Sequence, residues 1–135
     1  MITEKTEIRV RYGEVDRMGY LHHGVYLLYF EQGRTDLIRR LGISYREIED
    51  RGYILPVHDI KIRYLLPARY DEVVVVTTRL SKKPAVRFEF EYQVHNENGD
   101  LLCEATALLV LASRDSGKPV RMPDFFETIL AEHFN

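Results

Sequence analysis

One long helical pattern, followed by a long stretch of two-residue periodicity, limits the folds open to this 135-residue chain. Apolar residues recur at helical spacing from about Gly24 to Leu41, and Gly42 follows as a stop signal. The first half of this segment, V-Y-L-L-Y-F, is apolar on nearly every side. Such a helix is surrounded by other structure rather than lying on a surface. Gly33 in its interior costs about 1 kcal/mol relative to alanine, which predicts a close backbone approach there.

Shorter elements flank this helix. Residues 8–12 alternate apolar and charged side chains, with Tyr12 on the apolar side, which predicts a half-buried strand. Ser44, followed three residues later by Glu47, matches a capping box and predicts a second, short helix ending near Gly52. Residues 123–134 have the pattern of a weak C-terminal helix.

The middle and end of the chain have the two-residue period of strands. The predicted strands cover residues 59–66, 73–76, 86–94 and 101–112. Residues 73–76 are a continuous β-branched run, which suits a strand buried on both faces. Asn98-Gly99 is a strong hairpin signal between the last two strands.

This order of elements predicts an α+β fold in one domain, residues 1–135, because no linker or repeat interrupts the chain. We expect a largely antiparallel sheet of five or six strands with the long helix against one face. A single helix leaves sheet edges and apolar surface uncovered. Homo-oligomerisation, as a homodimer or a homotetramer, is therefore expected.

Composition narrows the class of protein. Hydrophobic residues make up 45% and charged residues 30% of the chain, as in ordinary soluble domains. A net charge of −2 with mixed signs gives neither a nucleic-acid footprint nor a polybasic membrane patch. Cys103, the single cysteine, fits a reducing compartment. The charged N-terminus and the absence of a run of about 20 apolar residues argue against secretion and membrane insertion, so a cytoplasmic protein is expected.

The segment between the first strand and the long helix carries the chemistry. Residues 14–26 read E-V-D-R-M-G-Y-L-H-H-G-V-Y and place Asp16, His22 and His23 in one turn. Carboxylates and imidazoles act as bases, nucleophiles and proton donors. The helix N-terminus beside them supplies backbone N–H donors for a developing oxyanion.

The same segment resembles a family signature. The matching positions are Tyr12, Glu14, Asp16, Gly19, His22-His23, Tyr26 and Phe30-Glu31-Gln32-Gly33-Arg34. They resemble hotdog-fold acyl-CoA thioesterases of the 4-hydroxybenzoyl-CoA thioesterase and YbgC type. The resemblance implies a sheet wrapped around one long central helix, and hydrolysis of an acyl-CoA thioester to free acid and CoA. The chain departs from this signature at His22, where the family often has Tyr, and at Val25, where it often has Asn.

The resemblance also implies roles for residues of the loop. Asp16 matches the catalytic carboxylate, which acts either as a general base on water or as a nucleophile that forms a mixed anhydride. His23 matches the family histidine and is the second catalytic candidate. The backbone N–H groups of Gly24, Val25 and Tyr26 are the candidate oxyanion hole.

Other residues are candidates for substrate binding. Tyr20 lines a substrate pocket or fills the core. Glu31, on the apolar helix, is an alternative catalytic carboxylate, or pairs with Arg34 or a neighbouring strand, because an unpaired buried carboxylate is costly. Glu14 is expected to be a loop contact. The basic cluster expected to bind the phosphates of coenzyme A is Lys82, Lys83 and Arg87.

Three alternatives to an acyl-CoA thioesterase stay open from the sequence. The pantetheine arm can be presented by an acyl-carrier protein instead of coenzyme A. A hotdog dehydratase would pair His23 with Glu31. A non-catalytic module would bind acyl-thioesters without turnover. The residues of the loop favour the hydrolase, and no Cys/His spacing predicts a metal or another cofactor.

Overall fold

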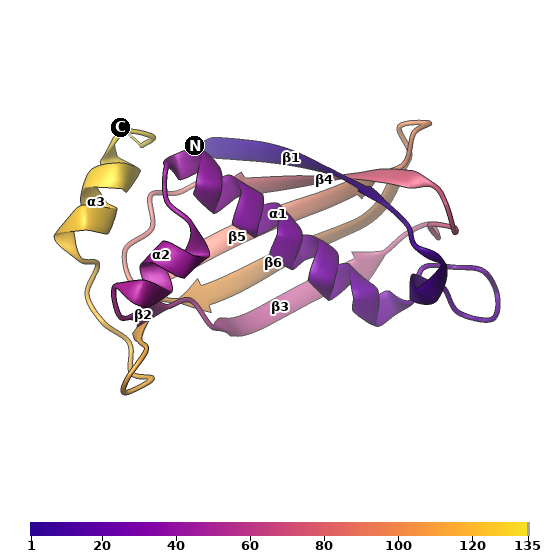
Figure 1. The fold of residues 1–135 in the computed structure, drawn as a ribbon. Helices are drawn as coiled ribbons and strands as arrows, with labels where there is room; N and C mark the ends of the chain where they lie inside the picture. Colours follow the sequence, from indigo (N-terminus) through magenta and orange to yellow (C-terminus); the bar gives the residue numbers. More distant parts are fainter. Residues whose placement is uncertain (135) are drawn as a thin grey trace.

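The computed structural model describes residues 1–134 as a five-stranded antiparallel sheet with one long helix across one face (Figure 1). The strand order is β1-β4-β5-β6-β3. These strands are β1 (Ile2–Arg9), β3 (Val57–Tyr64), β4 (Val73–Leu80), β5 (Arg87–His95) and β6 (Leu101–Val110). Two short strands, β2 (Tyr53–Ile54) and β7 (Ala112–Ser113), pair separately. The helices are α1 (Tyr26–Leu41), α2 (Tyr45–Asp50) and α3 (Asp124–Ala131), with single turns η1 (Tyr12–Glu14) and η2 (His23–Val25). The predicted α+β architecture is confirmed.

The core lies between α1 and the inner face of the sheet. Phe30 is fully buried and stacks on Tyr92 of β5, with ring centroids 4.6 Å apart. The close approach predicted at Gly33 is confirmed. A Cβ there would overlap Thr78 Oγ1 and lie 3.1 Å from Val76 Cγ1, both on β4. The absence of a side chain at Gly33 therefore sets how closely α1 packs on the sheet.

The first strand differs from its prediction. It covers residues 2–9, and the chain has already turned into η1 at Tyr12, whose side chain is 78% exposed rather than inward-facing. The early part was missed because a threonine, Thr6, occupies a buried position and breaks the apolar alternation. Thr6 remains satisfied there because its hydroxyl donates to Asp36 Oδ2 of α1 at 2.7 Å.

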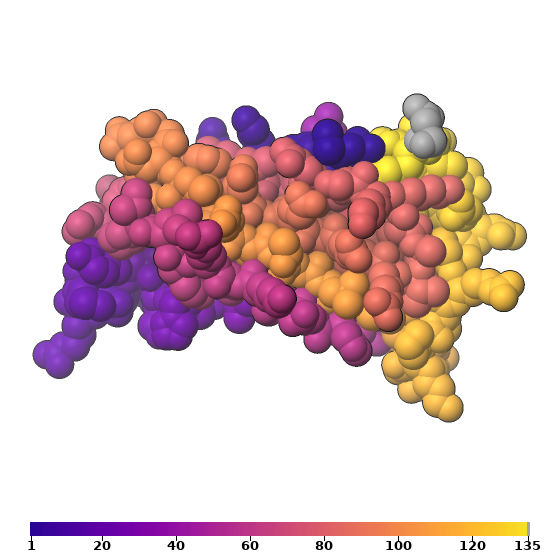
Figure 2. All heavy atoms as spheres, turned by 180° about the vertical axis from the view of Figure 1, so that it is seen from behind, coloured from indigo at the N-terminus to yellow at the C-terminus, as the bar shows by residue number. Residues whose placement is uncertain are grey.

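The strand predicted at residues 73–76 is also different. Val74 and Val76 are buried, but Val73 and Val75 are only half-buried, so the strand is covered fully on one face only. Within residues 1–134, no helix covers the outer face of the sheet (Figure 1), and side chains of the strands form the surface there (Figure 2). The β-branched run therefore reflects strand propensity rather than two buried faces.

The two edge strands are protected differently. On β1, Arg40 of α1 donates to the Thr3 carbonyl at 3.0 Å, so a helix side chain occupies part of that edge. On β3, no comparable contact covers the free side within residues 1–134, and Val57 is 45% exposed. At the other end of β3, the ring of Tyr64 lies 5.5 Å from that of Tyr26, and Leu27, the next residue of α1, is 44% exposed. The β3 edge and the start of α1 form the open apolar side of the protomer.

Candidate active site

Asp16 is held in a defined orientation by its own loop. Its Oδ1 accepts hydrogen bonds from the backbone N–H groups of Met18 (2.9 Å) and Tyr20 (3.2 Å). The turn between them closes at Gly19, whose φ of 82° favours glycine. Asp16 is half-buried, and its Oδ2 has no hydrogen-bond partner in the described part of the chain. One carboxylate oxygen is therefore anchored while the other is free to react.

A buried carboxylate supports this loop from below. Glu14 is 8% exposed and accepts from Arg11 Nη2 and from the Tyr29 hydroxyl, both at 2.7 Å. Its backbone carbonyl accepts from the His22 N–H at 2.9 Å, which joins the two ends of the loop. Burial opposes ionisation of Glu14, but the hydrogen bonds from Arg11 and Tyr29 outweigh it, so the pKa of Glu14 is lowered. Glu14 is thus a loop contact, as expected.

Replacing this carboxylate is expected to weaken the fold in a pH-dependent way. Glu14→Gln should lower the free energy of unfolding by about 1–3 kcal/mol near neutral pH, because a charge-assisted network is lost. Because the pKa of Glu14 is lowered in the folded state, the ionised carboxylate stabilises the fold at pH values above the ordinary glutamate pKa. This contribution disappears as the pH falls through the pKa of Glu14 in the folded state. Urea unfolding at about pH 7 and about pH 3 should show the difference between the two proteins shrinking in acid.

The matched control is Glu7→Gln, since Glu7 is an exposed residue of β1. That variant should change stability by no more than about 0.5 kcal/mol. A Glu14→Gln protein as stable as wild type at both pH values would show that the network does not hold the loop.

The N–H groups at the helix start are mostly occupied. The Val25 N–H donates to the His22 carbonyl at 3.0 Å, and the Tyr26 N–H is directed at the Gly24 carbonyl. The Gly24 N–H donates to His22 Nδ1 at 3.1 Å. Only this last acceptor is a side chain, which can rotate away. Of the three predicted oxyanion donors, Gly24 is therefore the one that a ligand can engage by displacing His22.

His23 connects the helix start to the edge strand β3. Its carbonyl accepts from the Tyr64 hydroxyl at 2.9 Å, and its ring is stacked on His22 with centroids 4.3 Å apart. The side chain is exposed. No hydrogen bond joins His23 to Asp16 within residues 1–134, so the two predicted catalytic residues lie in one loop without being directly hydrogen-bonded.

The other predicted residues at the loop are divided between surface and core. Tyr20 is half-buried, and the Arg69 guanidinium lies 5.0 Å from its ring centroid. Tyr26 is almost fully buried, and this burial raises its pKa. Val25 packs against the core. Tyr26 and Val25 therefore support the helix start, while Tyr20 has surface to offer a ligand. No pattern in the sequence pointed to Arg69.

Glu31 is exposed on α1, and the expected ion pair with Arg34 is absent within the described chain. Eight residues separate His23 from Glu31, about 12 Å along a helical axis. A dehydratase-type pair of these two side chains is therefore not formed within one protomer.

The predicted phosphate-binding cluster lies away from the loop. β4 starts beside Arg9, where β1 leads into the loop, and ends beside Ile2. Lys82 and Lys83 follow that far end, where Lys82 pairs with Glu89 at 3.9 Å and Lys83 pairs with Glu127. Arg87, the first residue of β5, lies near the same end. Within one protomer, the fold does not bring these cations to Asp16.

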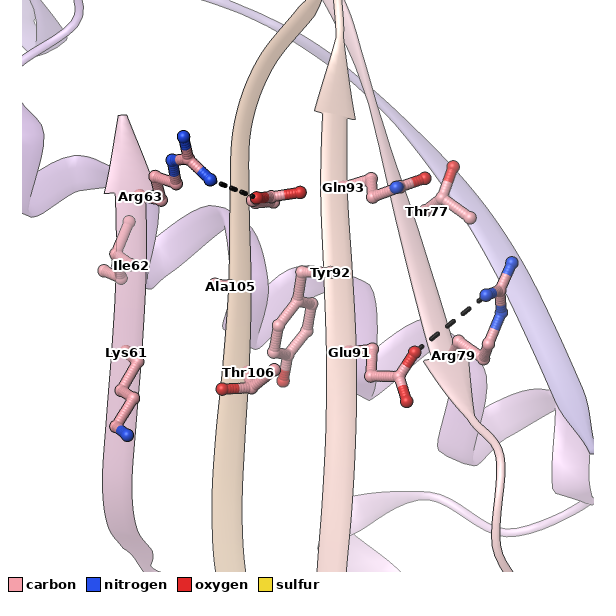
Figure 3. Close-up of a pocket in the computed structure, with 11 residues that line it drawn as sticks. Lys61, Ile62, Arg63, Thr77, Arg79, Glu91, Tyr92, Gln93, Ala105 and Thr106 are labelled. Atoms are coloured by element: carbon pink, nitrogen blue, oxygen red, sulfur yellow. Dashed lines mark ion pairs between the residues drawn. The ribbon is translucent and has the colours of Figure 1, made fainter. Parts of the chain in front are cut away.

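A hollow of about 330 Å³ on the outer face of the sheet is a separate feature (Figure 3). Arg63 and Glu104 form an ion pair of 3.7 Å on one side, and Arg79 and Glu91 form one of 3.9 Å on the other. These four charges are therefore paired with one another, whereas Lys61, which also lines the hollow, forms no ion pair within residues 1–134. The hollow lies on the side of the sheet away from α1. Within residues 1–134, no cluster of His, Cys, Asp and Glu suits a metal ion, and no helix is long and apolar enough to span a membrane.

Comparison with known proteins decides the family. Residues 10–130 match the model of the thioesterase-like superfamily. The chain belongs to this family. A curated relative from Bacillus subtilis, named "Putative acyl-CoA thioesterase YneP", is 37% identical over 93% of this chain and 91% of its own length.

Comparison with solved structures agrees with this assignment. The DHNA-CoA thioesterase of Staphylococcus aureus superposes with a TM-score of 0.92 at 35% identity, covering 98% of this chain and 91% of that one. The hypothetical protein TT1821 of Thermus thermophilus has a TM-score of 0.88 at 36% identity, covering 95% and 97%. The predicted hotdog fold of a thioesterase is confirmed.

Proposed function

We propose that this protein hydrolyses acyl-CoA thioesters to a free acid and CoA, with Asp16 as the reacting carboxylate. The observation that carries the proposal is the geometry of Asp16, whose Oδ1 is fixed by two loop N–H groups while Oδ2 is free. The named activities of the Bacillus and Staphylococcus relatives support a thioester substrate. A thioester carbonyl is electrophilic and thiolate is a good leaving group. One correctly oriented carboxylate is therefore sufficient to catalyse the hydrolysis.

Two routes use the free oxygen. In the first, Oδ2 takes a proton from water, which attacks the thioester carbonyl and expels CoA thiolate. In the second, Oδ2 attacks the carbonyl itself, CoA thiolate leaves, and water then cleaves the mixed anhydride. In both routes the carbonyl oxygen gains negative charge, which the Gly24 N–H stabilises once His22 has moved away. The exposed His23 ring orients the thioester or protonates the departing sulfur.

The direct test is release of free thiol from acyl-CoAs of short, medium, long and aromatic type, followed with a chromogenic disulfide reagent. The same acyl groups on an acyl-carrier protein provide the second arm. Turnover of CoA substrates supports the proposal. Turnover of carrier-protein substrates alone would identify an acyl-carrier-protein thioesterase instead. Binding of acyl-CoA without thiol release on either carrier would contradict hydrolysis.

A single turnover in water labelled with oxygen-18 separates the two routes. With Asp16 as general base, the label enters the carboxylic acid product. With Asp16 as nucleophile, labelled water attacks the aspartyl carbon of the mixed anhydride, so the label remains in the Asp16 carboxylate. Mass spectrometry of the product and of the peptide containing Asp16 distinguishes these outcomes.

We further propose that the active unit is a homodimer that pairs the β3 edges of two copies. Three observations support this: the edge of β3 is uncovered, Val57 at its start and Leu27 near its end are exposed, and Arg40 partly closes the other edge of the sheet. A second copy would also bring cations to the loop from outside. Lys82, Lys83 and Arg87 can serve coenzyme A phosphates at Asp16 only across such an interface.

A lysine at the open apolar side is expected to weaken this dimer. Leu27→Lys should raise the dimer dissociation constant by about 10- to 100-fold, because burying an unpaired ammonium in an interface is costly. Concentration-dependent light scattering or sedimentation measures this shift. The control is Gln32→Lys, an exposed position on the same helix turned toward β1. Equal dissociation constants for the two variants would place the interface elsewhere.

A further inference from the structure

The imidazole of His22 occupies the space in front of the Gly24 N–H. That N–H donates to His22 Nδ1 at 3.1 Å, which makes His22 the N-cap of η2. The ring also lies close to the Gly24 backbone, because a Cβ at Gly24 would be 3.3 Å from Nδ1 and 3.4 Å from Cε1. The N–H group that a substrate carbonyl oxygen would need is therefore covered by a side chain of the same turn.

The ring of His22 can leave this position without moving the loop. The side chain is exposed to solvent, and it stacks on the ring of His23, which is exposed as well. The backbone of His22 is held separately, because its N–H donates to the Glu14 carbonyl at 2.9 Å. Rotation about the side-chain bonds of His22 would therefore uncover the Gly24 N–H while the backbone stays in place.

The contact requires a neutral His22 ring. A ring nitrogen accepts a hydrogen bond only when it carries no proton, and a protonated imidazole donates from both nitrogens. Histidine side chains commonly change charge between about pH 5 and pH 8. A positive ring would also be repelled by the N-terminal end of the helical segment that begins with η2 and continues as α1. Protonation of His22 therefore breaks the contact and leaves the Gly24 N–H free.

No fixed counter-ion holds the His22 ring in either charge state. The titratable groups that contact or flank it are His23 on the same turn and Tyr64 at the end of β3, whose hydroxyl donates to the His23 carbonyl. Glu14 on η1 keeps its carboxylate in the buried network described above, and Asp16 binds N–H groups of its own turn. Within residues 1–134, no carboxylate forms an ion pair with His22.

We propose that His22 gates the oxyanion donor of this site: the neutral ring covers the Gly24 N–H, and the protonated ring leaves it to the substrate carbonyl oxygen. This inference rests on the proposed thioesterase function. The gate is a property of this chain, because the thioesterase signature often has Tyr at this position, and a tyrosine ring carries no acceptor nitrogen. At alkaline pH, each turnover must first break the contact between His22 and Gly24.

Two variants at position 22 test the gate. His22→Phe removes the acceptor, whereas His22→Asn keeps one that is never protonated, since asparagine is a favoured N-cap residue. Loss of thioester absorbance gives kcat/KM for the most active acyl-CoA at about pH 8 and about pH 5.5. His22→Phe should be about 3- to 10-fold faster than wild type at the higher pH and no faster at the lower one. His22→Asn should equal wild type at the higher pH and be about 3- to 10-fold slower at the lower one. Ratios to wild type at each pH cancel the effects of pH on the other groups.

His133→Asn is the matched control, because the His133 carbonyl contacts the N-terminal amine of Met1, at the end of β1 opposite the loop. This variant should match wild type at both pH values. Ratios for the position 22 variants that do not change with pH overturn the gate alone.

Nitrogen NMR of the His22 ring tests the gate without a substrate. At about pH 8 the ring proton should be on Nε2, because Nδ1 accepts from the Gly24 N–H. A proton on Nδ1 would overturn the gate whatever the activity. No turnover of any acyl-CoA by all of these proteins overturns the proposed function as well, so the two failures are distinguishable.

Discussion

Asp16→Asn is expected to lower kcat/KM for thioester hydrolysis by about 1,000-fold or more, while the fold and oligomeric state are retained. The asparagine Oδ1 can still accept from the Met18 and Tyr20 N–H groups, so the loop keeps its conformation. The free atom becomes an amide nitrogen, which neither takes a proton from water nor attacks a carbonyl. Thiol release by the two proteins, with size-exclusion chromatography of each, measures the effect.

Asp115→Asn is the matched control, because Asp115 is an exposed residue in the turn after β7. This variant should retain full activity. Retained activity in Asp16→Asn would exclude both proposed routes and move the search to Glu31, the other carboxylate weighed from the sequence. Glu31→Gln would then be the informative variant.

Gly33→Ala is expected to destabilise the protein by about 1–3 kcal/mol, although alanine is the better helix former. The new methyl group would overlap Thr78 Oγ1 and crowd Val76 on β4. Thr78 is fully buried, so its hydroxyl has little room to move. Urea denaturation measures the loss. Thr78→Ala removes the overlapping oxygen, so adding it to Gly33→Ala should recover part of that loss as a coupling energy.

Gly13→Ala is the control, since a Cβ at Gly13 would meet nothing within 4 Å. It should change stability by about 0.5 kcal/mol or less. Should Gly33→Ala be as stable as wild type, α1 must be able to move away from β4 without cost. The packing of the helix on the sheet would then not depend on this glycine.

The elements that could be predicted from the sequence are those whose signals are local. The capping box of α2 is present, with the Glu47 N–H donating to Ser44 Oγ at 3.1 Å. The Asn98-Gly99 turn joins β5 and β6, and Gly99 has the positive φ of 85° that such a turn requires. Both patterns involve residues within four positions of each other, so backbone geometry alone determines them. The start of β1 was missed because the sequence shows that residue 6 is a threonine but does not show that it is buried.

Part of the candidate site was equally local. Asp16, Gly19 and His22 fall in one loop because they are close in the chain, and the family signature located them. What the signature did not reveal is which atoms are occupied. Asp16 Oδ1 and the Gly24 N–H are both engaged within the loop, and this depends on torsion angles that residue types do not specify.

The sequence by itself determined one long helix, four strands after it and a carboxylate loop before it, because periodicity records which side of each element is buried. Tertiary structure alone brought Arg34, Tyr45 and Tyr92 together from α1, α2 and β5. It also placed Lys82 at the end of the sheet opposite Asp16, because β4 runs antiparallel to β1. These spatial arrangements depend on strand direction, strand register and helix rotation, which are set by packing between segments far apart in the chain.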